Sequence, residues 1–258
     1  PHDEYTLKFE RFFQFEDFSH PVAWVTMRES RLPNLNMLDE QPMVNNFEPF
    51  VPGRYQRWME SLGEVDPAPW ADMLTLMGVE TIERVSSVDG NGVRFVSWGG
   101  GDANLVRWVP CAQPVADGQQ ALRVIAGGAL DVDETITVEG DFLPQSSPCY
   151  GGRGDVHLQA RPSPSKVVFD VEADQPGWVL WSEVWYPGWR ARVDGQPVPV
   201  RRGNCLFQAV HVPEGRHEVV LVYRPFWFYV GGVITLAAVG AVLFFLKKKN
   251  QYIVTAVP

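Results

Sequence analysis

Charged residues are absent from one long stretch of this sequence. No Asp, Glu, Lys or Arg occurs between residues 225 and 246, and no acidic residue follows Glu218. As an α-helix the uncharged stretch would be about 33 Å long, enough to cross the hydrocarbon core of a bilayer. Lys247, Lys248 and Lys249 follow at once. We therefore predict a transmembrane helix over residues 225–246. Because basic residues stay on the cytoplasmic side, we expect residues 1–224 to be extracytoplasmic and the C-terminal tail to be cytoplasmic.

Basic residues are also scarce outside the tail. The 258 residues include 22 Lys and Arg against 31 Asp and Glu, and residues 1–224 alone have a net charge of −12. A protein that binds nucleic acid needs a basic face. This balance therefore argues against nucleic acid as a partner, and the uncharged helix predicts membrane lipid instead.

Residues with the spacing of metal or nucleophile sites are missing. The five histidines show no ligand spacing, and no C-x-x-C, H-E-x-x-H or G-x-S-x-G motif occurs. We expect no metal, no cofactor and no catalytic residue in this chain. Cys111, Cys149 and Cys205 are too few for a disulfide framework. We interpret them as three thiols, with one bridge and one free thiol as the alternative.

The sequence has neither an initiator Met nor an N-terminal signal segment, although its large domain would have to cross a membrane. We favour a piece of a longer membrane protein whose earlier segments achieve this. A mature protein that has lost its signal peptide is the alternative.

Hydrophobic periodicity predicts an α+β fold. Residues 54–62 and 69–77 have helical spacing, and the turn formers at 89–92 precede a change to period two. Between 165 and 224, short alternating strands separated by tight turns predict an antiparallel, jelly-roll-like β-sandwich. The predicted segments are a mixed α/β part (1–90), a β-rich connecting part (91–164), the sandwich (165–224), the transmembrane helix (225–246) and the tail (247–258).

Four of the ten tryptophans lie within residues 178–189. We interpret most of them as core residues, because large apolar rings dominate core packing. Strand alternation places Trp181 and Trp185 on one face with Glu183. This face is our candidate for a sugar-stacking surface.

Arginines flank the predicted Asp194-Gly195 hairpin turn. If the two strands pair, Arg190, Arg192 and Arg202, with the neighbouring Arg201, form a basic patch that suits phosphate groups of a lipid or polymer. Solvated charges that protect a sheet edge are the alternative. The six candidate substrate-binding residues are Trp181, Glu183, Trp185, Arg190, Arg192 and Arg202.

Two groups of motifs occur in a characteristic order. The first includes PNLNML at 33–38 and VNNFEPF at 44–50; the second includes SEVWYPGWRARVDG at 182–195 and YRP at 223–225, just before the uncharged stretch. Together they resemble the C-terminal region of the YfhO family of bacterial membrane proteins, which are polytopic and related to the GT-C glycosyltransferases. Family members commonly have Asp-Gly-Tyr where this chain has Asn-Asn-Phe at 45–47.

The resemblance implies a multi-spanning envelope protein that transfers a sugar from a polyprenyl-phosphate carrier to a cell-envelope polymer. Catalytic acidic residues of GT-C enzymes lie in an early loop, which this chain lacks. The chain would then be the accessory extracytoplasmic domain with the last helix, and its partners the rest of the parent, the polyprenyl-phosphate sugar and the envelope glycan. A membrane-anchored carbohydrate-binding or scaffold module without enzymatic activity is the alternative.

Overall fold

The computed structural model describes residues 51–62, 67–89, 92–99, 104–140 and 151–254. Motifs and elements predicted before residue 51 lie outside this part of the chain. The helices are α3 (Gly53–Leu62), α4 (Pro67–Leu76), α5 (Gly118–Ala126) and α6 (Phe226–Val254). The strands are β1 (Thr81–Asp89), β2 (Gly92–Gly99), β3 (Val106–Val109), β4 (Cys111–Val115), β5 (Thr135–Glu139), β6 (Gly154–Ser163), β7 (Lys166–Ala173), β8 (Gly177–Val184), β9 (Trp189–Val193), β10 (Gln196–Val198), β11 (Arg201–Gly203), β12 (Phe207–Val212) and β13 (Gly215–Tyr223).

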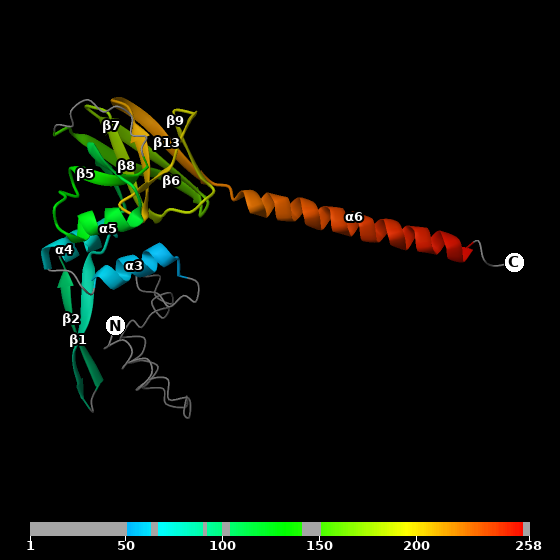
Figure 1. Ribbon diagram of the computed structural model, residues 1–258, viewed down its shortest axis with the longest axis horizontal. Coiled ribbons are helices and arrows are strands. Elements are labelled where there is room, and N and C mark those ends of the chain that lie inside the picture. The colour runs from blue at the N-terminus through cyan, green and yellow to red at the C-terminus, as the bar shows by residue number, and fades with distance from the viewer. Residues whose placement is uncertain (1–50, 63–66, 90–91, 100–103, 141–150, 255–258) are drawn as a thin grey trace.

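Two sheets face each other to form the body of the molecule (Figure 1). One sheet has the strand order β3-β8-β12-β11-β5-β4 and the other the order β10-β9-β13-β7-β6. Side chains between them, among them Phe169, Val210 and Leu221, form one buried cluster. The predicted α+β class with a β-sandwich and a C-terminal helix is confirmed.

The short helices cover the outer face of the six-stranded sheet. Trp58 of α3 and Met73 of α4 join Leu180 and Phe207 of the sheet in a second buried cluster. The centre of the six-stranded sheet is therefore buried on both faces, and residues 177–181 at the start of β8 are all buried, as their apolar run predicts. The hairpin β1–β2 forms a separate two-stranded sheet that projects from the body (Figure 1).

The sandwich begins earlier in the chain than the predicted range 165–224. Strands β3 to β6 come from residues 106–163; β3 pairs with β8, β5 with β11 and β6 with β7, and β4 joins the sheet through β5. The β4–β5 pair is parallel, because α5 provides the crossover between these two strands. Helix α5 was not predicted from the sequence. Its N-cap is Asp117, whose side chain accepts a hydrogen bond from the Gln120 amide at 2.8 Å, and Ala121 and Ile125 are buried at helical spacing.

The predicted hairpin turn between β9 and β10 is present. Asp194 (φ 49°) and Gly195 (φ 79°) both adopt the left-handed region that this turn type requires. The Asp194 carboxylate accepts hydrogen bonds from the Glu218 amide at 2.9 Å and from Nδ1 of His217 at 2.6 Å. Nε2 of His217 lies 2.9 Å from the Glu214 carbonyl oxygen. Because both ring nitrogens face acceptors, the pKa of His217 is raised, and the bond from His217 lowers the pKa of Asp194.

The cysteines differ from our prediction. Cys111 is disulfide-bonded, which corrects the interpretation of three thiols. Cys205 is free and buried, and desolvation raises the pKa of its thiol. Cys149 lies outside the described residues. Sequence spacing could not decide which cysteines form a disulfide, because a bridge requires that the fold bring the Cα atoms of two cysteines within about 7 Å.

Helix α6 leaves the body directly from β13, with only Arg224 and Pro225 between them (Figure 1). Its residues Phe226–Phe244 are long and apolar enough to cross a membrane, and this stretch is not buried against the rest of the chain. The last strand of the sandwich therefore ends where the predicted membrane span begins.

Candidate functional site at the membrane-proximal end

The turn between β8 and β9 is attached to the two-residue connection that leads from β13 into α6. The amide of Trp189 donates to the Tyr186 carbonyl oxygen at 3.4 Å, and Gly188 has a φ of 119°, as expected for a Pro-Gly turn. The amide of Arg224 donates to the Gly188 carbonyl oxygen at 2.8 Å. A Cβ at Gly188 would lie 3.1 Å from Cα of Pro225, so glycine allows this close approach. The turn is thus held beside the membrane-proximal end of β13.

Trp181 is a core residue and not a surface for sugar stacking. Only 5% of it is exposed, and its ring packs edge-to-face on Phe169 and Trp189 at centroid distances of 5.7 and 5.2 Å. This corrects the prediction for Trp181. Alternation correctly put it on the opposite face from Trp178, but both faces of β8 are covered, so neither ring is free to stack on a ligand.

Trp185 follows β8 and lies in a cluster of charged residues. The guanidinium of Arg202 stacks over its ring at 3.9 Å, a cation–π contact, while its indole N–H donates to the Val200 carbonyl oxygen at 3.3 Å. Arg202 also donates to Oε2 of Glu139 at 3.3 Å. Arg54 of α3 makes a bidentate pair with the same carboxylate. One carboxylate thus holds two guanidinium groups, and the cluster has a net charge of +1.

Glu183 lies apart from this cluster. Its carboxylate is 3.6 Å from the guanidinium of Arg161 on β6, and its side chain is 43% exposed. Partial desolvation raises the pKa of Glu183, although the nearby Arg161 lowers it. The contact joins β8 of the six-stranded sheet to β6, an edge strand of the five-stranded sheet.

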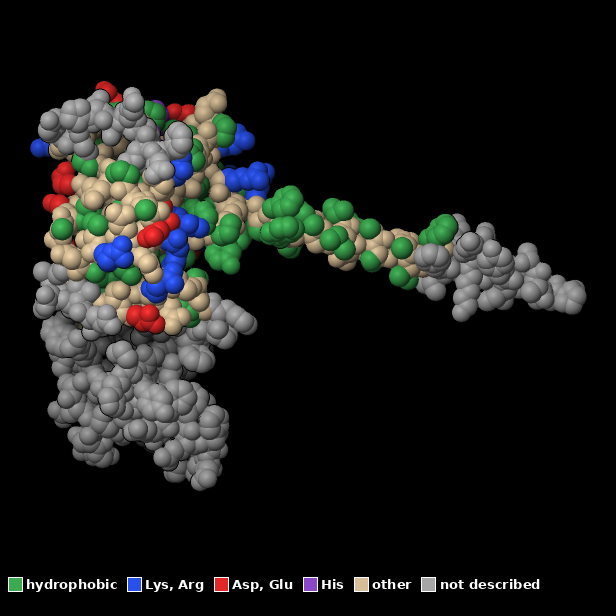
Figure 2. All heavy atoms as spheres, viewed as in Figure 1, with side chains coloured by type: hydrophobic (Ala, Val, Ile, Leu, Met, Phe, Trp, Pro, Cys, Tyr) green, Lys and Arg blue, Asp and Glu red, His purple; other side chains and the backbone are tan. Residues whose placement is uncertain are grey.

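Arg190 and Arg192 lie on the outer face of β9. The alternate residues Ala191 and Val193 are buried, so the two arginines point to solvent. Arg190 pairs in register with Val222, two residues from Arg224. The predicted patch is therefore divided, because Arg190 and Arg192 belong to the five-stranded sheet and Arg202 to the six-stranded one. Figure 2 shows Lys and Arg side chains beside the start of α6.

The chain's last strands carry a recognisable family pattern. Residues 160–235 match the family model of the bacterial membrane protein YfhO. The match runs from β6 into α6 and includes the Tyr186–Trp189 turn and the β13–α6 junction. It confirms the resemblance over this segment and supports a membrane protein domain. No curated protein and no solved structure matches the chain.

Arg54, Glu139 and Arg224 were not predicted as site residues. Glu139 is 63 residues from Arg202 and 85 from Arg54, so no local pattern could have joined them. Arg224 could have been found, because it is the last charged residue before the apolar run. Among the described residues, no group of three or more His, Cys, Asp or Glu side chains could hold a metal ion.

Proposed function

We propose that this chain contributes an extracytoplasmic accessory domain to a polytopic, glycosyltransferase-like membrane protein of the cell envelope. In this proposal the domain rests on the outer surface of the bilayer. It helps to position a polyprenyl-phosphate sugar for transfer to an envelope polymer. The domain itself performs no chemistry.

The observation that carries the proposal is the attachment of the Tyr186–Trp189 turn to the connection between β13 and α6. A two-residue connection with a 2.8 Å hydrogen bond between Arg224 and Gly188 leaves no flexible stalk. The sandwich would therefore stand directly on the membrane. The YfhO match over the same residues supports a role that depends on the membrane.

The side chains at this end suit a headgroup layer that contains phosphate. Tyr186 is 54% exposed, and Trp227 and Tyr229 follow at the start of α6, where amphipathic rings prefer the membrane interface. Arg190 and Arg224 are exposed close by. Guanidinium groups bind phosphate oxygens in a bidentate manner, so this surface could hold the pyrophosphate or phosphate of a lipid carrier.

The proposal is tested on the intact parent protein in its own membranes. Arg190→Gln combined with Arg224→Gln should reduce sugar transfer several-fold at normal protein levels, and Arg190→Lys with Arg224→Lys should restore part of it. Arg123→Gln, an exposed arginine on α5, is the control and should transfer at the normal rate.

Unchanged transfer in the double glutamine variant would overturn the proposal. The reading frame upstream of Pro1 provides an independent check. A series of hydrophobic spans supports the polytopic parent, whereas a cleavable signal peptide supports the membrane-anchored carbohydrate-binding or scaffold module.

A further inference from the structure

Two turns flank the connection between β13 and α6. Strand β13 lies between β7 and β9 in the five-stranded sheet, so the β6–β7 turn and the β8–β9 turn lie on either side of its last residues. The amide of Tyr223 donates to the Ser165 carbonyl oxygen of the first turn at 2.8 Å, as the amide of Arg224 does to Gly188 of the second. Both turns are therefore fixed where the apolar helix begins. We call residues 161–166, 186–190 and 222–225 the membrane-proximal platform.

Basic side chains from adjacent strands meet on this platform. Lys166 of β7 and Arg190 of β9 both pair in register with Val222 of β13. Residues directly opposite each other in antiparallel strands lie on the same face, so the two basic side chains flank Val222 on the outer face of the sheet. Both are exposed, and the exposed Arg224 follows two residues after Val222. Three separate segments thus bring positive charge to one end of the sheet.

Acidic residues offset only part of this charge. The platform itself contains no Asp or Glu, and its fourth basic residue is Arg161. The carboxylate of Glu183, which lies outside the platform, is 3.6 Å from the guanidinium of Arg161 and offsets this one charge. The four basic residues and Glu183 together have a net charge of +3. The membrane-proximal end of a domain with an acidic composition is therefore basic.

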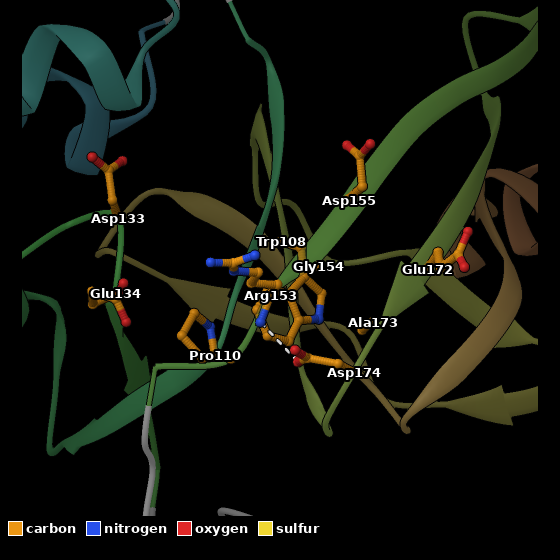
Figure 3. A pocket seen from close by; sticks show the side chains of 11 residues that line it. Trp108, Pro110, Asp133, Glu134, Arg153, Gly154, Asp155, Glu172, Ala173 and Asp174 are labelled. Carbon is orange, nitrogen blue, oxygen red and sulfur yellow. Dashed lines mark hydrogen bonds between the residues drawn. The ribbon is translucent and has the colours of Figure 1, made fainter.

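The opposite end of the sandwich is acidic. An open cavity of about 700 Å³ lies there, and its lining includes one basic residue, Arg153. Figure 3 shows the acidic residues of this lining, which are Asp133, Glu134, Asp155, Glu172 and Asp174. Ala173 of the same lining pairs in register with Gly215, the first residue of β13, whereas the platform surrounds the last residues of that strand. The nine residues of β13 thus separate the acidic end from the basic end by about 27 Å.

This charge asymmetry favours one kind of surface as the partner of the platform. The two ends are more than three Debye lengths apart, because one Debye length is about 8 Å at physiological ionic strength. The acidic end therefore does not cancel the attraction of the platform for negative charge. A negatively charged bilayer attracts the platform and repels the acidic end, whereas a bilayer without net charge does not distinguish between them.

We propose that the membrane-proximal platform binds anionic phospholipid headgroups of the bilayer that contains α6. Lys166 and Arg190 lie two strand spacings apart, about 10 Å, with Val222 between them, so they suit neighbouring headgroups better than one phosphate. The inference rests on the placement of the domain in the proposed function and deepens it, because it names the lipid class that surrounds this end. Each basic residue near an anionic surface should strengthen the preference about fivefold at low salt.

The test uses the full chain in bicelles that contain phosphatidylcholine and phosphatidylglycerol, whose headgroups have separate phosphorus NMR resonances. A nitroxide spin label on Ser165→Cys, in the exposed β6–β7 turn, broadens the resonances of nearby headgroups. The phosphatidylglycerol resonance should broaden several-fold more than the phosphatidylcholine resonance. The same label on Pro176→Cys, which is exposed at the acidic end, should broaden neither. The wild-type chain treated with the label gives the background, because Cys205 is buried.

Charge variants are then made in the Ser165→Cys chain. Lys166→Gln should lower the preference for phosphatidylglycerol by up to about fivefold, and Lys166→Arg should retain it. Arg153→Gln removes the same charge at the acidic end and is the matched control, which should keep the full preference. Unchanged broadening of phosphatidylcholine reports that the label in each variant still lies at the same height above the bilayer. Added sodium chloride should lower the preference in the unmodified platform.

Three outcomes would overturn the proposal. The label on Ser165→Cys broadens both lipids equally, Lys166→Gln has no more effect than Arg153→Gln, or inorganic phosphate removes the preference when sodium chloride of the same ionic strength does not. The last result would indicate a site for a single phosphate. None of them decides the proposed function, because sugar transfer is tested through Arg190 and Arg224 without Lys166. A lipid preference that depends on Lys166 in a parent whose transfer ignores the two arginines would instead leave the platform assigned and the proposed function wrong.

Discussion

Trp58 joins the helical layer to the sandwich, and its truncation should destabilise the whole domain. The side chain of Trp58 is completely buried. Its ring packs edge-to-face on Phe207 of β12 at a centroid distance of 5.4 Å, and its indole N–H lies 3.1 Å from Sδ of Met77. Replacement by alanine removes these contacts and leaves a cavity between α3 and the six-stranded sheet.

The magnitude follows from this complete burial. Truncation of a fully buried aromatic residue to alanine costs about 3–5 kcal/mol. In a domain of this size each kcal/mol lowers the melting temperature by roughly 2–4 °C. We therefore expect Trp58→Ala to melt about 6–20 °C below the wild type. Trp58→Phe retains most of the ring and should lose less than half as much.

The assay is thermal unfolding of the full chain in detergent micelles, followed by near-ultraviolet circular dichroism. Trp227→Ala is the matched control, because this indole is 78% exposed at the start of α6 and its loss should leave the melting temperature of the sandwich unchanged. A shift below about 2 °C in Trp58→Ala would show that the helices fold independently of the sheet, and would refute the reasoning from a shared core.

Three further changes test other contacts. Glu139→Ala leaves two guanidinium groups without their shared carboxylate and should cost about 1–3 kcal/mol in denaturant unfolding; no loss would mean that the cluster is not coupled to folding. His217 has a raised pKa, so its protonated contact with Asp194 should stabilise the domain fully below pH about 6.5 and progressively less as the pH rises through that raised value. The difference in melting temperature between wild type and His217→Gln should shrink towards alkaline pH, and a constant difference would contradict this. Gly188→Ala places a Cβ 3.0 Å from the Tyr223 ring at a positive φ, and should increase proteolysis of the β8–β9 turn; wild-type cleavage rates would disprove the strain.

Much of the candidate site was predictable, but its grouping was not. The Pro-Gly turn, the Asp194-Gly195 hairpin and the solvent-facing Arg190 and Arg192 follow from local rules of turn chemistry and alternation. The division of the arginines between two sheets does not. Strand order depends on which hydrophobic faces bury each other, and these faces are distant in sequence.

The sequence by itself determined the apolar helix that is long enough to cross a membrane, the change from helical to strand periodicity and the charge difference between domain and tail. These features are local, because helix length, side-chain alternation and charge can be read over a few consecutive residues. The family pattern at 182–195 is local in the same way, and the match at 160–235 contains it.

Only the tertiary structure decided which tryptophans are core residues and which lie beside charged or hydrogen-bonding groups. Trp181 is buried because the second sheet covers β8, and Trp185 is stacked because β11 brings Arg202 to it. Trp108 lines a cavity because Gly154 and Gly177 approach its ring from other strands. Such contacts join residues far apart in the chain, and their energies depend on packing that no local pattern records.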